Sequence, residues 1–309
     1  MGARRGPGGG ENAAVTFRSG FACLVGRPNA GKSTLTNALV GTKVAIISNR
    51  PQTTRHAIRG IVHRPDAQLV LVDTPGLHKP RTLLGQRLND LVRTTWAEVD
   101  AIGFCLPADE PVGPGDRYIA RELARLSTPV VGVVTKTDTV DKARVAEQLV
   151  AASGLLDFAE LVPVSAVTGF QVDVLADLLV GLLPEGPPLY PDGELTDEPE
   201  ETLVAELIRE AALEGVREEL PHSLAVTIEE MHPREGRDDL LEIYANVYVE
   251  RPSQKPIVLG PRGERMKQVG TAARRQIEAL LGIHVYLDLH VRVAKDWQRD
   301  PKQLRKLGF

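Results

Sequence analysis

The chain has 309 residues, of which 42% are hydrophobic and 25% are charged, and its formal net charge is −4. This length predicts two domains, either of which can bury a core. The negative charge excludes a general attraction to nucleic acid or anionic lipid, and no apolar run approaches the length of a membrane span. Both cysteines, Cys23 and Cys105, lie within apolar runs. We therefore expect buried, reduced thiols rather than a disulfide or a metal site.

Residues 1–17 open with a Gly-rich stretch that lacks the apolar segment of a signal peptide. Regular patterning of apolar residues begins only at about residue 18. We therefore predict a disordered tail and a cytoplasmic protein.

Between residues 18 and 183, short apolar runs alternate with amphipathic stretches of helical length. The predicted strands are residues 21–25, 69–72, 101–106, 130–134 and 161–164. The predicted helices are residues 33–39, 83–99, 115–126, 141–152 and 171–182. Apolar strands that alternate with helices predict an α/β domain whose mainly parallel sheet is covered on both faces.

The chain changes character at residues 184–200, which we predict to be an acidic, Pro-rich linker. Positions 184–202 hold five prolines and seven acids but no Lys or Arg. Residues 201–309 predict a second domain. Its expected elements are a helix at 201–218, strands at 223–229 and 240–251 around a polar turn at 232–239, a helix–loop–helix region at 253–281 and a strand at 283–293. This α-β-β-α-α-β order indicates a small α+β domain with a three-stranded sheet.

Residues 26–34 match the pattern G-x-x-x-x-G-K-[ST] between a predicted strand and a predicted helix. In this setting the N–H groups of the loop and the helix N-terminus bind phosphate oxygens. Lys32 would neutralise the outer phosphates, and the Ser33 hydroxyl would ligate Mg2+. The predicted nucleotide-binding residues here are Gly26, Arg27, Pro28, Asn29, Ala30, Gly31, Lys32, Ser33 and Thr34.

Three further motifs follow predicted strands, where ligands bind in open α/β sheets. Asp73 would hold Mg2+ through water while Gly76 meets the γ-phosphate. The Asp138 carboxylate would pair with the N1 and N2 donors of guanine and reject adenine, so GTP and GDP are the predicted ligands. At Thr135 the usual Asn is replaced, and we expect the loss of an amide that steadies the loop. The predicted contacts are Asp73, Thr74, Pro75, Gly76, Thr135, Lys136, Thr137, Asp138, Ser165 and Ala166.

Residues 51–56 lie where a switch segment would close on Mg2+ when the γ-phosphate is present. We predict Thr54 as the ligand, with Thr53 as the alternative; a polar loop with two incidental threonines is the competing interpretation. Leu77 stands where many GTPases carry a water-orienting Gln, so slow hydrolysis is expected. The Asn29 carbonyl would help to bind K+ beside the phosphates, unless Asn29 serves only the loop geometry. The predicted metal ligands are Ser33, Thr54 and Asp73, and the predicted catalytic residues are Asn29, Lys32, Thr54 and Gly76.

Residues 260–263 form a G-x-x-G sequence within the predicted helix–loop–helix region. In a KH domain such a loop lies close to four backbone nucleotides. Residues 251–309 also hold thirteen basic and five acidic residues, a net charge of +8 that suits phosphates; a merely solvated basic face is the alternative. The predicted RNA-binding residues are Gly260, Pro261, Arg262, Gly263, Arg265, Lys267, Arg274 and Arg275.

From about residue 18 to 309, the chain resembles the Era family of bacterial GTPases. The resemblance rests on residues 26–34, Gln-Thr-Thr-Arg-His at 52–56, Asp-Thr-Pro-Gly-Leu-His at 73–78, Ser165-Ala166, Glu-Leu-Pro-His at 219–222 and the closing residues 304–309. It implies a P-loop GTPase domain followed by a type II KH domain. It further implies binding to the 3′ region of 16S ribosomal RNA during maturation of the small ribosomal subunit, and peripheral association with the inner face of the cytoplasmic membrane. The departures are Thr135, Pro261 and the Gly-rich N-terminal extension.

The leading hypothesis is a GTP-driven RNA-binding switch, in which GTP orders residues 48–56 and the region after Asp73 and so changes how the basic C-terminal domain is presented. A further hypothesis from charge is that the acidic linker masks the basic face in one nucleotide state. One alternative is a metabolic or transport NTPase whose C-terminal domain binds protein. Another is a membrane-surface GTPase that uses its basic tail on anionic lipid. A monomer is expected, although the sequence leaves the oligomeric state open.

Overall fold

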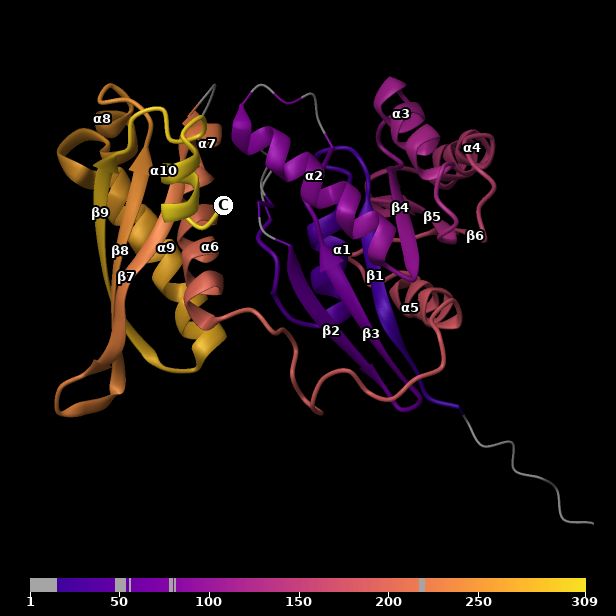
Figure 1. Ribbon diagram of the computed structural model, residues 1–309, viewed down its shortest axis with the longest axis horizontal. Helices are drawn as coiled ribbons and strands as arrows, with labels where there is room; N and C mark the ends of the chain where they lie inside the picture. The colour runs from indigo at the N-terminus through magenta and orange to yellow at the C-terminus, as the bar shows by residue number, and fades with distance from the viewer. Residues whose placement is uncertain (1–15, 48–53, 56, 78–79, 81, 217–219) are drawn as a thin grey trace, which may run out of the picture.

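The protein folds around two β-sheets, each with its own helices. The computed structural model describes residues 16–47, 54–55, 57–77, 80, 82–216 and 220–309. The first sheet has six strands in the order β2-β3-β1-β4-β5-β6, and the second has three in the order β7-β8-β9. Figure 1 shows the two units side by side, with the connection between them running along one edge of both. We call residues 16–183 the N-terminal unit and residues 200–309 the C-terminal unit.

The N-terminal unit is the α/β layer structure that the alternating pattern predicts. Its strands are parallel except for the antiparallel pairing of β2 with β3. Strand β2 was not predicted, because its apolar residues show no regular alternation. The elements are β1 (Arg18–Val25), α1 (Lys32–Val40), β2 (Ile58–Arg64), β3 (Ala67–Asp73), α2 (Leu83–Glu98), β4 (Ala101–Pro107), α3 (Pro114–Leu123), β5 (Val130–Thr135), α4 (Lys142–Ser153), β6 (Glu160–Pro163) and α5 (Val172–Gly181).

Both faces of the first sheet are covered. Helices α1 and α5 pack on one face through residues such as Leu35 and Leu175. Helices α2, α3 and α4 pack on the other through residues such as Trp96 and Ile119. Cys23 and Cys105 are buried within these layers and free, as predicted. None of the helices described in the structure is long and apolar enough to cross a membrane.

The C-terminal unit follows the predicted order, with two short helices added. It contains α6 (Glu200–Leu213), α7 (Leu220–Ser223), β7 (Ala225–Arg234), β8 (Arg237–Val249), α8 (Gln254–Leu259), α9 (Glu264–Leu281), β9 (His284–Val293) and α10 (Pro301–Lys306). The predicted turn at 232–239 was wrong, because the β7–β8 hairpin closes only at 234–237. The end of this hairpin is exposed on both faces, so apolar alternation could not reveal it.

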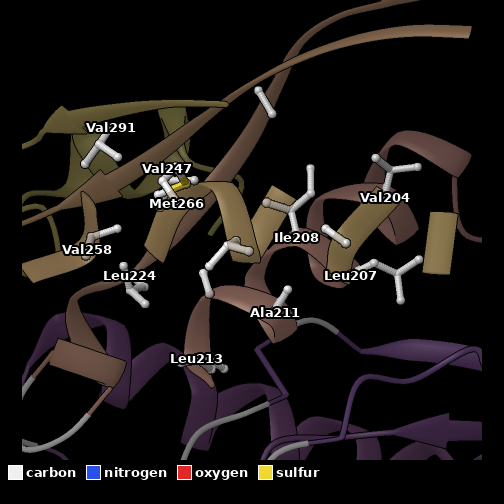
Figure 2. Packing of buried hydrophobic residues seen from close by; sticks show 14 of the residues in the cluster. Val204, Leu207, Ile208, Ala211, Leu213, Leu224, Val247, Val258, Met266 and Val291 are labelled. Atoms are coloured by element: carbon white, nitrogen blue, oxygen red, sulfur yellow. The ribbon is translucent and has the colours of Figure 1, made fainter. Parts of the chain in front are cut away.

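The core of the C-terminal unit lies between α6, α9 and the three-stranded sheet. Ile208 and Val204 of α6, Met266 of α9 and Val247 of β8 belong to one buried cluster. Figure 2 shows these side chains converging between the helices and the strands. The apolar residues of α6 therefore pack within the C-terminal unit. Its polar residues are left to contact the N-terminal unit.

The connector between the units is fixed along the first sheet. The Gln68 side chain accepts hydrogen bonds from the N–H groups of Leu189 (2.6 Å) and Tyr190 (2.9 Å). The Ile61 N–H donates to the Leu195 carbonyl at 2.9 Å, and Asp197 pairs with Arg59 of β2 at 2.8 Å. One of the acids of the connector, Asp197, is therefore paired with a base of the N-terminal unit. In this conformation the connector contacts the N-terminal unit, and masking of the basic face in one nucleotide state stays a hypothesis.

Candidate nucleotide and RNA sites

The phosphate loop joins β1 to α1 with the geometry that its motif predicts. Gly31 precedes the helix with a φ of 87°, a left-handed conformation that favours glycine. The Lys32 ammonium donates to the carbonyls of Gly26 (3.2 Å) and Arg27 (3.0 Å), so it lies inside the curve of the loop. Burial lowers the pKa of Lys32, while the nearby Asp73 carboxylate acts in the opposite direction. A buried ammonium that donates to two loop carbonyls is suited to receive phosphate oxygens.

Three oxygen groups meet beside the loop. The Ser33 hydroxyl lies 3.0 Å from Asp73 Oδ2 and 3.2 Å from the Thr54 hydroxyl, which in turn lies 3.0 Å from the same Asp73 oxygen. Asp73 is fully buried, and burial raises its pKa. Its other oxygen, Oδ1, is buried with no hydrogen-bond partner among the described residues. An orphaned carboxylate oxygen next to two hydroxyls is a donor set that fits Mg2+.

The segment that follows β3 lies against the phosphate loop. A Cβ atom added to Gly76 would lie 3.4 Å from the Pro28 nitrogen and 3.5 Å from the Lys32 ammonium. Gly76 therefore lies beside the phosphate loop and the Lys32 ammonium, and its contact with the γ-phosphate stays a prediction. Leu77 turns away and packs against the apolar layer on the α2 side of the sheet, so its side chain has no polar group to offer a water molecule.

The predicted guanine site contains two hydrogen bonds that connect its motifs. Ser165 donates to the Asp138 carboxylate at 2.6 Å, which orients an otherwise exposed acid. The Thr135 hydroxyl is buried and donates to the Ala30 carbonyl of the phosphate loop at 2.7 Å. The amide of the usual Asn is absent, as stated from the sequence, but the hydroxyl that Thr135 keeps makes a contact with the phosphate loop. The shorter threonine side chain still fastens the base-binding strand to the phosphate loop.

Acidic residues that were not predicted hold the basic residues of this site. Arg27 pairs with Asp116 of α3 at 2.8 Å and with Glu110 at 2.9 Å, so its guanidinium is directed toward α3. Lys136, with a left-handed φ of 56°, pairs with Asp109 at 3.0 Å. In the sequence these acids look like ordinary loop and helix-start residues, because only the fold brings them to the motifs.

Other predicted positions are placed by the loop and by the helix starts. Pro28 and Asn29 are exposed on the loop, and Asn29 has a left-handed φ of 64°. Thr34 lies in the first turn of α1, and Thr137 begins a short 3-10 turn that includes Asp138. The alternative ligand Thr53 lies outside the described residues.

The G-x-x-G loop joins α8 to α9 beside a groove. A Cβ atom added to Gly260 would lie 2.6 Å from Arg265 Cβ, so only glycine permits this close approach. The groove has a volume of about 580 Å3 and lies between α9 and β9. Gly263, Lys267 and Arg274 line it together with Tyr286, which is 45% exposed. A cationic helix face opposite an exposed aromatic ring suits a single-stranded nucleic acid.

The other predicted RNA-binding residues are divided between the surface and the fold. Pro261, Arg262 and Arg275 are exposed but do not line the groove, and Pro261 lines a second pocket beside α6. Arg265 instead donates to the carbonyls of Ala212, Glu214 and Val258 at 2.8, 2.8 and 3.1 Å. Burial lowers the pKa of Arg265. This side chain closes the end of α6, so its predicted role in the groove was wrong. Tyr286 was missed, because it is part of a regular strand pattern.

Comparisons with known proteins agree with both sites. A family model described as "50S ribosome-binding GTPase" matches residues 21–136, and one described as "KH domain" matches residues 219–298. The chain is 71% identical to GTPase Era of Streptomyces coelicolor over 308 residues, which is 97% of each chain. The chain belongs to the Era family of GTPases. It hydrolyses GTP, and its C-terminal unit contains a KH domain.

Solved structures of Era match the whole arrangement. Aquifex aeolicus Era, as a variant bound to GDP·AlF4−, has a TM-score of 0.90 at 37% identity. Era in complex with MgGDPNP and nucleotides 1506–1542 of 16S ribosomal RNA has a TM-score of 0.90 at 38% identity. Each match covers 94% of this chain and 99% of the other. The Era assignment therefore extends to the way in which the two units are joined.

Proposed function

We propose that this Era family member uses GTP to time the binding of the 3′ region of 16S ribosomal RNA, and so assists assembly of the small ribosomal subunit. The observation that carries the proposal is the presence of both sites in one chain: an orphaned Asp73 oxygen beside a phosphate loop, and a cationic groove beside a G-x-x-G loop. The Era structure with MgGDPNP and a 16S fragment supports the same pairing of ligands.

At the nucleotide site, we assign Lys32 to the outer phosphates and Asp138 to guanine. Ser33 and Thr54 would hold Mg2+ directly and Asp73 would hold it through water, which suits their convergence. When bound, Mg2+ neutralises charge on the phosphate oxygens. Gly76 lies beside Lys32 and would present its N–H to the γ-phosphate. With Leu77 in the apolar layer, hydrolysis depends on backbone groups, bound ions or a partner to orient the water.

The Asn29 side chain would contribute to a K+ site beside the phosphates. Its support is the exposed position of Asn29 on the phosphate loop. Hydrolysis should be faster in K+ than in Na+, and Asn29→Ala should remove that difference. Equal rates in both ions for the unchanged chain would refute this role.

At the KH groove, Lys267 and Arg274 would contact phosphates, while Gly260, Gly263 and the exposed Arg262 allow the backbone of the RNA to approach. Tyr286 would stack on a base, since an exposed ring lines the groove. Pro261 offers no N–H, and Arg275 adds charge next to Arg274.

The experiment is a titration of a 16S 3′ fragment with the chain bound to GDP or to a non-hydrolysable GTP analogue. We expect the affinities to differ between the two nucleotides, and Lys267→Glu with Arg274→Glu to reduce the salt dependence by about one unit of slope per contact. Lys302→Glu, an exposed cation on α10, is the matched control. Equal RNA affinities in both nucleotide states would exclude the timing role.

Three further parts of the proposal concern the setting of the protein. We propose a cytoplasmic monomer that associates peripherally with the inner face of the membrane, as the resemblance implies. Sedimentation with anionic liposomes, with and without residues 294–309, tests the membrane contact. Light scattering at several protein concentrations tests the monomer.

A further inference from the structure

The residue next to the proposed metal ligand Thr54 is anchored in the C-terminal unit. Arg55 is 2% exposed. Its guanidinium donates to the carbonyls of Leu224 at 2.5 Å and His222 at 2.9 Å, at the junction of α7 and β7. A planar guanidinium that reaches two carbonyls is held in both position and orientation. Because Thr54 and Arg55 are consecutive, this anchor restricts where the Thr54 hydroxyl can lie.

The rings of Trp297 and Phe309 also pack against Arg55. We call these two rings and the carbonyls of His222 and Leu224 the Arg55 seat. The guanidinium carbon lies 5.6 Å from the Trp297 ring centroid and 5.9 Å from that of Phe309, distances that favour a cation–π interaction. The rings stack on each other at 5.5 Å and 19°. Trp297 is fully buried and donates to the Ser223 carbonyl at 3.0 Å, and Arg87 of α2 donates to the Phe309 carbonyl at 2.7 Å. All of these partners of Arg55 belong to the C-terminal unit, so Arg55 contacts them only while the two units are docked.

The charges around this seat favour a fixed arrangement. Arg209 and Glu206 of α6 form a buried ion pair at 2.6 Å. Burial lowers the pKa of Arg55 to about 9; Arg209 acts in the same direction, whereas Glu206 and Glu250 oppose it. Arginine keeps its charge in proteins, so the Arg55 seat holds a cation. A buried charge is stable only with its partners. If the units separated, Arg55 would lose these partners and become exposed to solvent.

A second contact reaches the chain on the other side of residues 48–53. Glu210 of α6 accepts the Ile47 N–H at 2.9 Å and pairs with the Lys43 ammonium, which also donates to Gln276 of α9. The C-terminal unit thus contacts the N-terminal unit at Lys43 and Ile47 as well as at Arg55. In the sequence these positions lie on both sides of residues 48–54, which end with the proposed metal ligand Thr54.

We propose that Arg55 is a positioning residue that holds Thr54 at the Mg2+ site, and that the C-terminal unit sets the affinity for Mg2+·GTP by supplying the seat of Arg55. The inference rests on the proposed role of Thr54 as a metal ligand. It assigns a nucleotide-linked role to Trp297 and Phe309, which lie in the other unit. By linkage, Mg2+·GTP must strengthen docking of the units by the same factor.

The experiment compares Phe309→Ala and Arg55→Lys with the unchanged full-length chain. Phe309→Ala removes one ring from the seat, and Arg55→Lys keeps the charge but loses the planar fork. Lys306→Ala, an exposed cation on α10, is the control. Affinity is measured for a fluorescent non-hydrolysable GTP analogue with Mg2+ and for GDP without Mg2+. We expect both seat variants to bind the Mg2+·analogue about tenfold more weakly, with GDP binding and the control unchanged.

A second readout follows docking directly. In a Trp96→Phe background, Trp297 is the one remaining tryptophan of the sequence, so its emission reports the seat. We expect Mg2+·analogue to change this emission in the chain with Arg55 and to have little effect after Arg55→Lys. A contact that served only the fold would lower both nucleotide affinities together and leave the emission insensitive to nucleotide.

Thr54→Ala separates the inference from the proposed function. If Thr54→Ala leaves the Mg2+-dependent affinity intact, the metal role of Thr54 fails, and the inference fails with it. If Thr54→Ala weakens Mg2+·analogue binding while Phe309→Ala and Arg55→Lys do not, the metal role stands and the positioning role is overturned. Loss of GDP binding in step with loss of Mg2+·analogue binding in the seat variants also overturns it.

Discussion

Replacing Thr135 by Val tests the bond that fastens the phosphate loop to the guanine-binding strand. Valine keeps the branched shape of threonine but removes the hydroxyl that donates to the Ala30 carbonyl at 2.7 Å. Thr135 is 4% exposed, so water cannot readily replace the lost donor. Removing a buried hydrogen-bond partner costs about 1–3 kcal/mol. Since about 1.4 kcal/mol is a tenfold change in affinity, we expect GDP to bind about tenfold more weakly.

The assay is equilibrium binding of a fluorescent GDP derivative, with thermal unfolding of the nucleotide-free chain measured in parallel. Thr135→Ser keeps the hydroxyl and is the matched control, for which near-normal binding is expected. Unchanged GDP affinity in Thr135→Val would refute the argument that this bond prepares the loop for phosphates. A lower melting temperature with normal affinity would assign the bond to the fold alone.

Three other perturbations follow from the structure. Asp73→Asn should stabilise the nucleotide-free and metal-free chain at neutral pH while abolishing the Mg2+ dependence of binding; because burial raises the folded pKa of Asp73 above 3.8, the gain in melting temperature should shrink as the pH falls toward 4. Ile208→Ala should destabilise the C-terminal unit by about 2–5 kcal/mol, measured by denaturant unfolding, because Ile208 is fully buried. Gln68→Ala removes the acceptor for two connector N–H groups and should increase proteolysis within residues 187–195, whereas Gln303→Ala should not.

The nucleotide site was largely predictable, because its motifs are contiguous and each follows a strand. The sequence order of the loop, Asp73, Asp138 and Ser165 becomes a single site because parallel strands end at one edge of the sheet. The contact of the Thr135 hydroxyl with Ala30 was not predicted, since it depends on how closely two neighbouring segments pack. The acids that hold Arg27 and Lys136 escaped prediction for the same reason.

The RNA groove was predictable in its loop and less so in its walls. The G-x-x-G spacing predicts Gly260 and Gly263, and the excess of basic residues predicts Lys267 and Arg274. Arg265 carries the same charge but closes the end of α6, and only the packing of α6 against α9 decides between these uses. Tyr286 acquires its position from the pairing of β9 with β8, which is a long-range contact.

The sequence by itself determined the family, the order of the elements and the phosphate-binding chemistry, because local patterns of glycine, charge and apolar residues specify these features. Tertiary structure alone decided how the two units contact each other. Arg55 lies beside Thr54 in the chain, yet its carbonyl and aromatic partners lie about 170 to 250 positions further along. The physical reason is burial, because a guanidinium taken out of water needs hydrogen-bond acceptors and other partners in place of water. Only docking of the two units brings Arg55 to these partners.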